Sequence, residues 1–210
     1  MLQVERLSIH FADREEVQEV VRGISFSVQD GEIVGIVGES GSGKTMTALT
    51  IAGLFKEHAV LDAGTIRLDG TDLLKLTERE MRQVQGNRIG MIFQEPMTAL
   101  NPTMKIGRQV EEVLRLHTDL DSRARKAAVI RALEEVELDE AEKLLFKYPH
   151  ELSGGMRQRV MIAAAMICRP SLLIADEPTT ALDAATQESI LKLLKKLNDK
   201  YGMSILFISQ

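Results

Sequence analysis

Residues 38–45 have the side chains and spacing needed to bind a polyphosphate. They match the pattern G-x-x-x-x-G-K-[ST] and lie between an apolar run and a helical stretch. Glycines let a loop wrap around an anion, so that backbone N–H groups and the positive end of the helix dipole face it. Lys44 would reach the β- and γ-phosphates, and the Thr45 hydroxyl would hold Mg²⁺. The predicted nucleoside triphosphate site comprises Gly38, Ser40, Gly41, Ser42, Gly43, Lys44, Thr45 and Met46.

Two adjacent carboxylates, Asp176 and Glu177, follow the apolar run of residues 172–175. Ligands of open α/β sheets collect at this end of a buried strand. Asp176 is placed to hold magnesium through water. Glu177 points to the other side and could face the γ-phosphate, where it would orient or deprotonate water. Taken alone, the pair could equally cap the next helix, but the phosphate-binding loop favours the catalytic interpretation.

Residues 152–158 indicate a second anion site. Ser153 and two glycines precede an apolar helical stretch, residues 160–168, which offers free N–H groups, a hydroxyl and a positive dipole end. An ordinary helix cap at Ser153, with glycines for the turn, explains the same pattern from local physics. Two anion sites far apart in one chain suggest that one of them completes the phosphate site of a partner copy.

Hydrophobic periodicity predicts the strands that must position these groups. Alternating apolar and polar residues, typical of half-buried antiparallel strands, occur at residues 2–9 and 24–28. Nearly continuous apolar runs, typical of strands buried on both faces of a parallel sheet, occur at residues 32–37, 172–175 and 204–208. Shorter strands are expected at residues 65–68 and 88–93.

Helical spacing fills most of the chain between residues 93 and 172, and a later helix is expected to bury Ile190, Leu191, Leu194 and Leu197. The predicted fold is α/β. It has a P-loop NTPase core with a mainly parallel sheet, an N-terminal antiparallel β part and an inserted α-helical subdomain. Residues 1–210 are expected to form a single domain, with the core in residues 1–94 and 169–210 and the helical subdomain in residues 95–168.

Composition narrows the class of protein. The 210 residues carry 26 Lys and Arg against 31 Asp and Glu, a net charge of −5, with 44% hydrophobic residues. This balance indicates a folded domain with no basic footprint for nucleic acid. A single cysteine, Cys168, excludes an internal disulfide and favours the cytosol. The longest apolar stretch, residues 160–168, is shorter than the roughly 20 residues that span a bilayer, so any membrane role is expected of a soluble subunit.

These motifs together resemble the ATP-binding subunits of ABC (ATP-binding cassette) transporters. The phosphate-binding loop, Gln94, the signature at residues 152–155, the Asp176–Glu177 pair and residues 181–183 stand in the family's order and approximate spacing. The resemblance runs from about Leu2 to the last residue. Residues 38–44 and 93–102 are similar to the branch that imports oligopeptides, dipeptides and nickel.

The resemblance implies a head-to-tail dimer, homomeric or heteromeric, with two ATP molecules between the phosphate-binding loop of one subunit and the signature of the other. Ser153 and Gly155 would then serve the partner's ATP. Gln94 would contact Mg²⁺ or the attacking water. The metal ligands would be Thr45, Gln94 and Asp176, and the catalytic residues would be Glu177, Gln94 and Lys44. Asp183 would link the two sites. Phe11 would stack on adenine, although a place in the core explains it too, and Arg157 and Gln158 would extend the signature or be exposed polar residues on a helix turn.

The same resemblance implies transmembrane permease subunits as partners, a solute-binding protein as an indirect partner, and a peripheral location at the cytoplasmic face of the cell membrane. Its expected activity is ATP hydrolysis coupled to uptake of peptides or a related small solute. Two alternatives are a catalytically defective nucleotide-binding fragment and an ABC-type ATPase that acts on DNA or in translation. The second usually adds coiled coils, zinc sites or tandem cassettes, so no nucleic-acid partner is expected.

The sequence departs from the family pattern at Gln210, where relatives carry a histidine that contacts the γ-phosphate. Glutamine can donate a hydrogen bond but cannot carry a positive charge, so stabilisation of the transition state should suffer. The sequence is also shorter than expected for the importer branch, which suggests a truncated product or a fragment. Residues 205–208 are therefore expected to leave apolar surface bare.

Overall fold

Two four-stranded sheets organise the computed structural model, which describes residues 1–12, 17–54, 59–180 and 182–210. The antiparallel sheet has the strand order β2-β1-β4-β5, and the parallel sheet has the order β3-β8-β7-β6. The strands are β1 Leu2–Ala12, β2 Val17–Val28, β3 Ile33–Val37, β4 Ala59–Leu68, β5 Thr71–Asp72, β6 Ile89–Ile92, β7 Leu172–Asp176 and β8 Ser204–Ser209. The predicted α/β class is confirmed.

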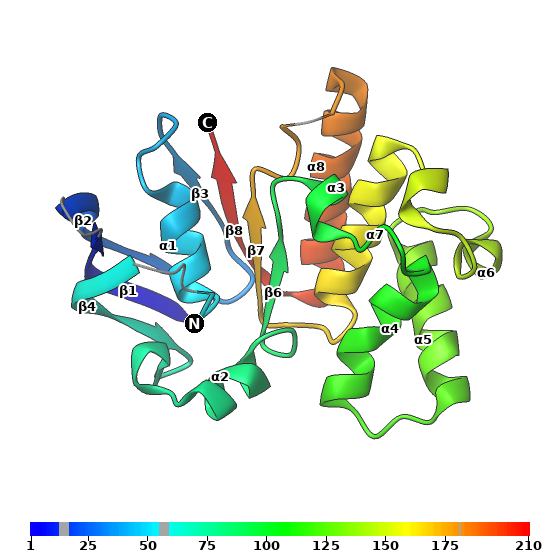
Figure 1. The fold of residues 1–210 in the computed structure, drawn as a ribbon, viewed down its shortest axis with the longest axis horizontal. Helices are drawn as coiled ribbons and strands as arrows, with labels where there is room; N and C mark the ends of the chain where they lie inside the picture. Colours follow the sequence, from blue (N-terminus) through cyan, green and yellow to red (C-terminus); the bar gives the residue numbers. More distant parts are fainter. Residues whose placement is uncertain (13–16, 55–58, 181) are drawn as a thin grey trace.

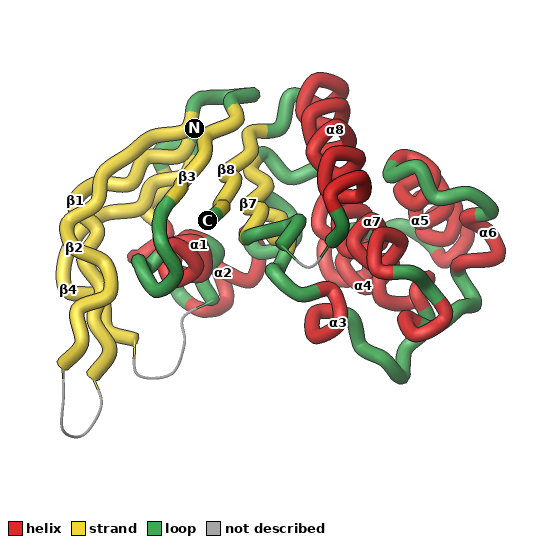
Figure 2. Tube along the Cα trace, turned by 90° about the horizontal axis from the view of Figure 1, so that it is seen from above, coloured by secondary structure: helices red, strands yellow, loops and turns green. Residues whose placement is uncertain are grey.

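The helices fall into two groups around the parallel sheet (Figures 1 and 2). On one side α1 lies between the two sheets, and on the other side α7 and α8 cover the parallel sheet, with α4, α5 and α6 beyond them. The helices are α1 Lys44–Ile51, α2 Glu78–Val84, α3 Pro96–Ala99, α4 Ile106–His117, α5 Ser122–Glu135, α6 Ala141–Leu144, α7 Gly154–Met166 and α8 Ala184–Tyr201, with 3-10 turns at Leu73–Lys75 and Pro149–Glu151.

Strand β7 shows how the two hydrophobic cores share the parallel sheet. Leu172 and Ile174 belong to the core that α1 forms with the antiparallel sheet, whereas Leu173 and Ala175 belong to the core of helices α4 to α8. Successive residues of a strand point to opposite faces, so a strand covered on both faces must be apolar throughout. This double burial explains the continuous apolar run at residues 172–175. The run ends at Asp176, the last residue of β7, and Glu177 follows it.

The expectation of bare apolar surface at residues 205–208 is wrong. Ile205 is 1% exposed, and Leu206 and Ile208 are fully buried. Strand β8 pairs with β3 on one side and β7 on the other, and both hydrophobic cores cover it. Within the parallel sheet the exposed apolar side chains lie on β3, an edge strand, where Ile33 is 41% and Val37 74% exposed.

The predicted set of buried residues on helix α8 is wrong at one position. Ile190, Leu194 and Leu197 are buried as expected, but Leu191 is 45% exposed and Leu193 is buried in its place. Residues three and four apart share a helix face, so a stripe through Ile190, Leu193, Leu194 and Leu197 fits the helical period better than one that includes Leu191. Among the described residues, no helix combines the length and apolarity needed to cross a membrane.

Candidate active site

The phosphate-binding loop connects the end of β3 to the first residue of α1. Gly43 caps α1 with a φ of 86°, and a Cβ at this position would lie 2.5 Å from the Val20 carbonyl oxygen. A side chain is therefore excluded there both by the left-handed backbone and by the close approach of β2. The Lys44 Nζ donates hydrogen bonds to the carbonyl oxygens of Gly38 at 2.5 Å and Glu39 at 2.8 Å. The loop thus curls around its own lysine, which is only 7% exposed.

Thr45 and Asp176 meet at the start of α1 although they are 131 positions apart. The Thr45 hydroxyl donates a hydrogen bond of 3.1 Å to Asp176 Oδ1. Asp176 ends strand β7 and is 2% exposed. A hydroxyl and a carboxylate are the oxygen ligands that Mg²⁺ prefers, so the donor set fits the ion predicted from the sequence.

Glu177 is surrounded by hydrogen-bond donors from three parts of the chain. Its carboxylate accepts hydrogen bonds from Gln94 Nε2 at 2.9 Å, Thr180 Oγ1 at 3.0 Å and Gln210 Nε2 at 3.2 and 3.4 Å. Its own backbone N–H donates to the Ile208 carbonyl, and its φ of 45° is rare for a residue with a side chain. This backbone conformation, held by β8, places Glu177, which is 6% exposed, at the end of the sheet.

Thr180 is a contact that sequence reasoning missed. A threonine three residues after an acid, in a turn, is a common local hydrogen-bond pattern and was the available signal. The structure also shows that Gln210 donates to Glu177, whereas the sequence indicated that this glutamine can donate a hydrogen bond but did not identify its partner.

A cavity of about 330 Å³ joins these groups. Its lining residues come from β1 and β2, the phosphate-binding loop, the end of β6 and the ends of β7 and β8: Phe11, Glu19, Val20, Ser40, Gly41, Gly43, Lys44, Thr45, Met46, Gln94, Glu177 and Gln210. Phe11 is half-buried and also packs against the core beside α1, so the cavity and the core both use this ring. Gly38 and Ser42 belong to the loop but are not among the residues that line the cavity.

The signature residues lie elsewhere in the chain. Ser153 caps α7 by accepting a hydrogen bond from the Met156 N–H, and Asp183 caps α8 by accepting from the Thr186 N–H and hydroxyl. These hydrogen bonds from Thr186, the hydroxyl first, hold the pKa of Asp183 below its usual range. Among the described residues that line the cavity, Ser153, Gly155 and Asp183 are absent. Ala181, the first residue of the predicted 181–183 motif, lies outside the described residues.

The two residues after the signature differ in their surroundings. Arg157 is half-buried and its Nε donates a hydrogen bond of 2.7 Å to the Pro149 carbonyl oxygen. Gln158 is only 1% exposed, with its Nε2 lacking a hydrogen-bond partner. The alternative of two exposed polar residues on a helix turn is therefore wrong for Gln158, because this side of α7 faces the helical core.

Residues 21–180 match the family model described as ABC transporter, and the chain belongs to this family. It is 47% identical over 210 residues to the probable peptide ABC transporter ATP-binding protein y4tR of Sinorhizobium fredii. It is 46% identical to the oligopeptide transport ATP-binding protein AppD of Bacillus subtilis and 45% identical to the dipeptide transport ATP-binding protein DppD of Escherichia coli. All of this chain is covered in each comparison, but it spans only 63% to 64% of the length of these relatives.

Solved structures show the same fold. The dimeric structure of the ATP-binding cassette MJ0796 in a post-hydrolysis state, bound to ADP and Pi, superposes with a TM-score of 0.88 at 30% identity. The match covers all of this chain and 88% of that one. CbiO1 of Clostridium perfringens, part of the transporter complex cbiONQ, superposes with a TM-score of 0.82 at 26% identity. This match covers all of the present chain and 78% of the CbiO1 chain.

Proposed function

We propose that this chain is the ATP-binding and ATP-hydrolysing part of an ABC importer that takes up peptides or a related small solute. The observation that carries the proposal is that Lys44, Thr45 and Glu177 line one cavity, while Asp176 accepts a hydrogen bond from Thr45 beside it. The solute class is supported by relatives that are named for peptide, oligopeptide and dipeptide transport.

Each group has a task in hydrolysis. The loop N–H groups and Lys44 bind the triphosphate, and Thr45 and Asp176, with Gln94, would hold Mg²⁺, which neutralises charge on the β- and γ-phosphates when bound. Glu177 orients a water molecule and accepts its proton as the water oxygen attacks the γ-phosphorus. The bond between the γ-phosphorus and the bridging oxygen then breaks, giving ADP and inorganic phosphate. Phe11 lines the same cavity and offers its ring to the adenine.

A second copy, or a related subunit, completes the site. The amino ends of α1, α7 and α8 and the ends of β7 and β8 lie along the upper edge in Figure 1. Ser153 and Gly155 stand on this edge but outside the cavity of their own chain. We propose that residues 95–168 carry this signature as one helical unit beside the core in residues 1–94 and 169–210. A head-to-tail dimer would place the signature over the partner's nucleotide.

The proposal is tested by the rate of Mg-ATP hydrolysis per chain, measured over a wide range of protein concentration. A specific rate that rises with concentration and then levels off is expected, because the complete site needs two chains. Direct ATP binding is measured in parallel. ATP binding with no turnover at any concentration would support the catalytically defective alternative, and a rate independent of concentration would contradict the dimeric site.

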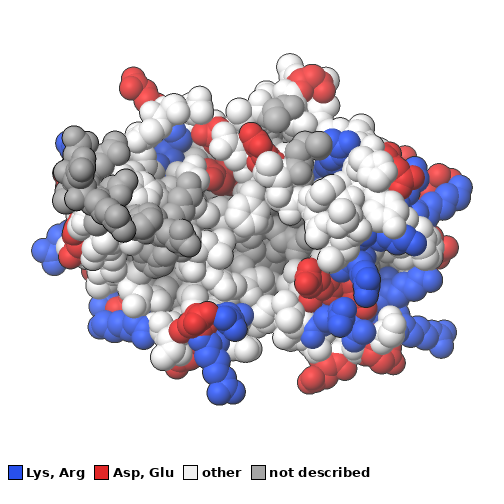
Figure 3. Space-filling view, viewed as in Figure 1, with Lys and Arg blue, Asp and Glu red and all other residues white. Residues whose placement is uncertain are grey.

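A groove beside α4 is proposed to take the membrane-spanning partner. It has a volume of about 330 Å³ and is lined by residues near the end of α1, by β6, α4 and α7, including Leu54, Phe93 and Val113. Figure 3 shows many charged side chains on the right of this face, over α4 to α6, and a further group at the lower left, with mainly uncharged atoms between the two groups. An apolar segment of a partner, such as a helix on a permease loop, suits this lining.

Leu54→Asp is expected to reduce solute uptake by about tenfold. The docked partner would bury the new carboxylate in the groove, and this burial would weaken docking by more than about 1.4 kcal/mol. Leu54 is 38% exposed, so ATP hydrolysis by the isolated chain should be unaffected. The matched control is Leu116→Asp, since Leu116 is 72% exposed and does not line the groove. Uptake and the amount of chain kept in washed membranes are measured. Equal losses for both variants would exclude the groove as the docking site.

Gln210→His is expected to raise turnover by about tenfold, more at pH 6 than at pH 8. Gln210 donates a neutral hydrogen bond to Glu177. A histidine there could also carry a positive charge below its ordinary pKa of about 6.5 and stabilise the charge that develops on the phosphate. Turnover of wild type, Gln210→His and Gln210→Ala is compared across pH. A histidine variant no faster than wild type at low pH would show that this position needs no charge.

A further inference from the structure

We propose that Arg159 is a positioning residue that fixes the amino end of α7 against α8, so that the signature is presented to the partner's nucleotide as one rigid edge. The inference rests on the proposed function, because it assigns a residue to the dimeric form of that site. Arg159 lies on α7, beyond the signature, and does not line the nucleotide cavity of its own chain.

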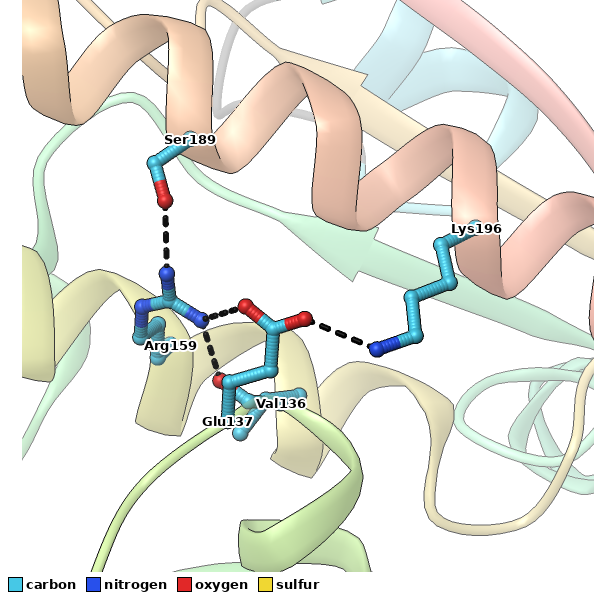
Figure 4. A network of polar contacts seen from close by, with 5 residues as sticks. All are labelled: Val136, Glu137, Arg159, Ser189 and Lys196. Carbon is cyan, nitrogen blue, oxygen red and sulfur yellow. Dashed lines mark hydrogen bonds and ion pairs between the residues drawn. The ribbon is translucent and has the colours of Figure 1, made fainter.

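The guanidinium of Arg159 joins three segments of the chain (Figure 4). Its Nη1 donates to the Val136 carbonyl oxygen at 2.5 Å and to Glu137 Oε2 at 3.1 Å, and its Nη2 donates to Ser189 Oγ at 2.8 Å. Val136 caps the end of α5, and Ser189 lies on α8. The side chain of Arg159 is 15% exposed, so water competes little for these hydrogen bonds.

Glu137 extends the network to a second point on α8. Its Oε1 accepts a hydrogen bond of 2.8 Å from Lys196 Nζ, while its Oε2 faces Arg159. Figure 4 shows Ser189 and Lys196 reaching from α8 toward the Arg159–Glu137 pair. Helix α8 is thus held at two points about two turns apart, which resists both sliding and tilting. The hydrogen bond from Lys196, followed by that from Arg159, lowers the pKa of Glu137, so the carboxylate is charged at neutral pH.

The network is close to the functional ends of both helices. A Cβ on Gly155 would lie 3.0 Å from Thr186 Cγ2, so the signature and the first turn of α8 already approach closely. Arg159 and Ser189 form the next connection, one turn further along each helix. Together these two contacts set the spacing between Ser153, which caps α7, and Asp183, which caps α8.

The planar guanidinium is what the geometry requires. It makes hydrogen bonds in two directions, toward the end of α5 and toward α8, from a single rigid fork. A lysine carries one compact ammonium group on a flexible chain and cannot span both directions in the same way. Arg159→Lys should therefore keep the positive charge but lose most of the positioning of the signature. Arg159→Gln should cause a similar defect.

The expected defect acts on the partner's site and not on the site of the same chain. Two mixtures test this, each with one component in large excess. In the first, Arg159→Gln is mixed with excess Lys44→Ala, so the intact phosphate-binding loop faces an intact signature edge. In the second, wild type is mixed with an excess of the double variant Lys44→Ala, Arg159→Gln, so the intact loop faces the altered edge. The rate per intact loop should be about tenfold lower in the second mixture.

Equal rates in the two mixtures would overturn the inference while leaving the proposed function standing, and an absence of turnover by wild type at every concentration would overturn both. The melting temperature and the ATP affinity of each single chain are measured as well, because a role in folding alone would lower the rate in both mixtures. If Arg159→Gln fails to fold, Ser189→Ala replaces it, since it removes only the hydrogen bond to α8. A smaller defect, again confined to the second mixture, is then expected.

Discussion

Glu177→Gln is expected to slow ATP hydrolysis by about 10²- to 10³-fold while ATP binding changes little. Glutamine has nearly the same shape as glutamate, but its amide cannot accept a proton from the attacking water. The carboxylate of Glu177 also accepts hydrogen bonds from Gln94, Thr180 and Gln210. An amide N–H₂ turned toward these donors would disturb their arrangement, which adds to the loss. Steady-state turnover and ATP affinity are measured on the same preparation.

The control for this prediction separates proton acceptance from positioning. Thr180→Ala removes one donor to Glu177 and keeps the carboxylate, so a loss of only about tenfold is expected, near the 1.5 to 3 kcal/mol of a hydrogen bond to a charged group. If Glu177→Gln hydrolysed ATP at the wild-type rate, the general base would have to be another group. If Thr180→Ala were as slow as Glu177→Gln, the position of the carboxylate would matter more than its basicity.

Lys44→Ala is expected to weaken ATP binding by about 10²-fold, which corresponds to the loss of charge-assisted hydrogen bonds worth roughly 1.5 to 3 kcal/mol each. Lys44 is 7% exposed and stands at the start of α1, beside the loop N–H groups that would face the phosphates. Water screens a charge at such a position poorly, so its attraction for a triphosphate is strong. Calorimetry with a slowly hydrolysed ATP analogue measures the affinity.

Lys192→Ala is the matched control, since Lys192 lies on the exposed side of α8 in an ion pair with Glu188 and far from the cavity lining. The control should bind the analogue as wild type does. A Lys44→Ala variant that folds, as judged by its melting temperature, and still binds with wild-type affinity would mean that the triphosphate does not occupy this loop.

Local sequence was sufficient to predict the elements and the loop that carries the chemistry. The pattern in residues 38–45 specifies a turn with left-handed glycines followed by a helix start, and both are properties of neighbouring residues. The apolar run of β7 is local in the same sense. Boundaries were less exact: α7 begins at Gly154, several residues before the expected apolar stretch, because a capped helix can start on polar and glycine residues.

The sequence by itself therefore determined the fold class and a set of candidate groups, while the tertiary structure decided which groups meet. Thr45 reaches Asp176 only because β7 lies in the same sheet as β3, two strands away, with β8 between them. The position of β8 between β3 and β7 also buries Ile205, Leu206 and Ile208 and brings Gln210 to Glu177, a contact that no local pattern indicated. Strand order depends on how distant segments bury their apolar faces together. The hydrophobic periodicity of a single segment therefore cannot specify the strand order.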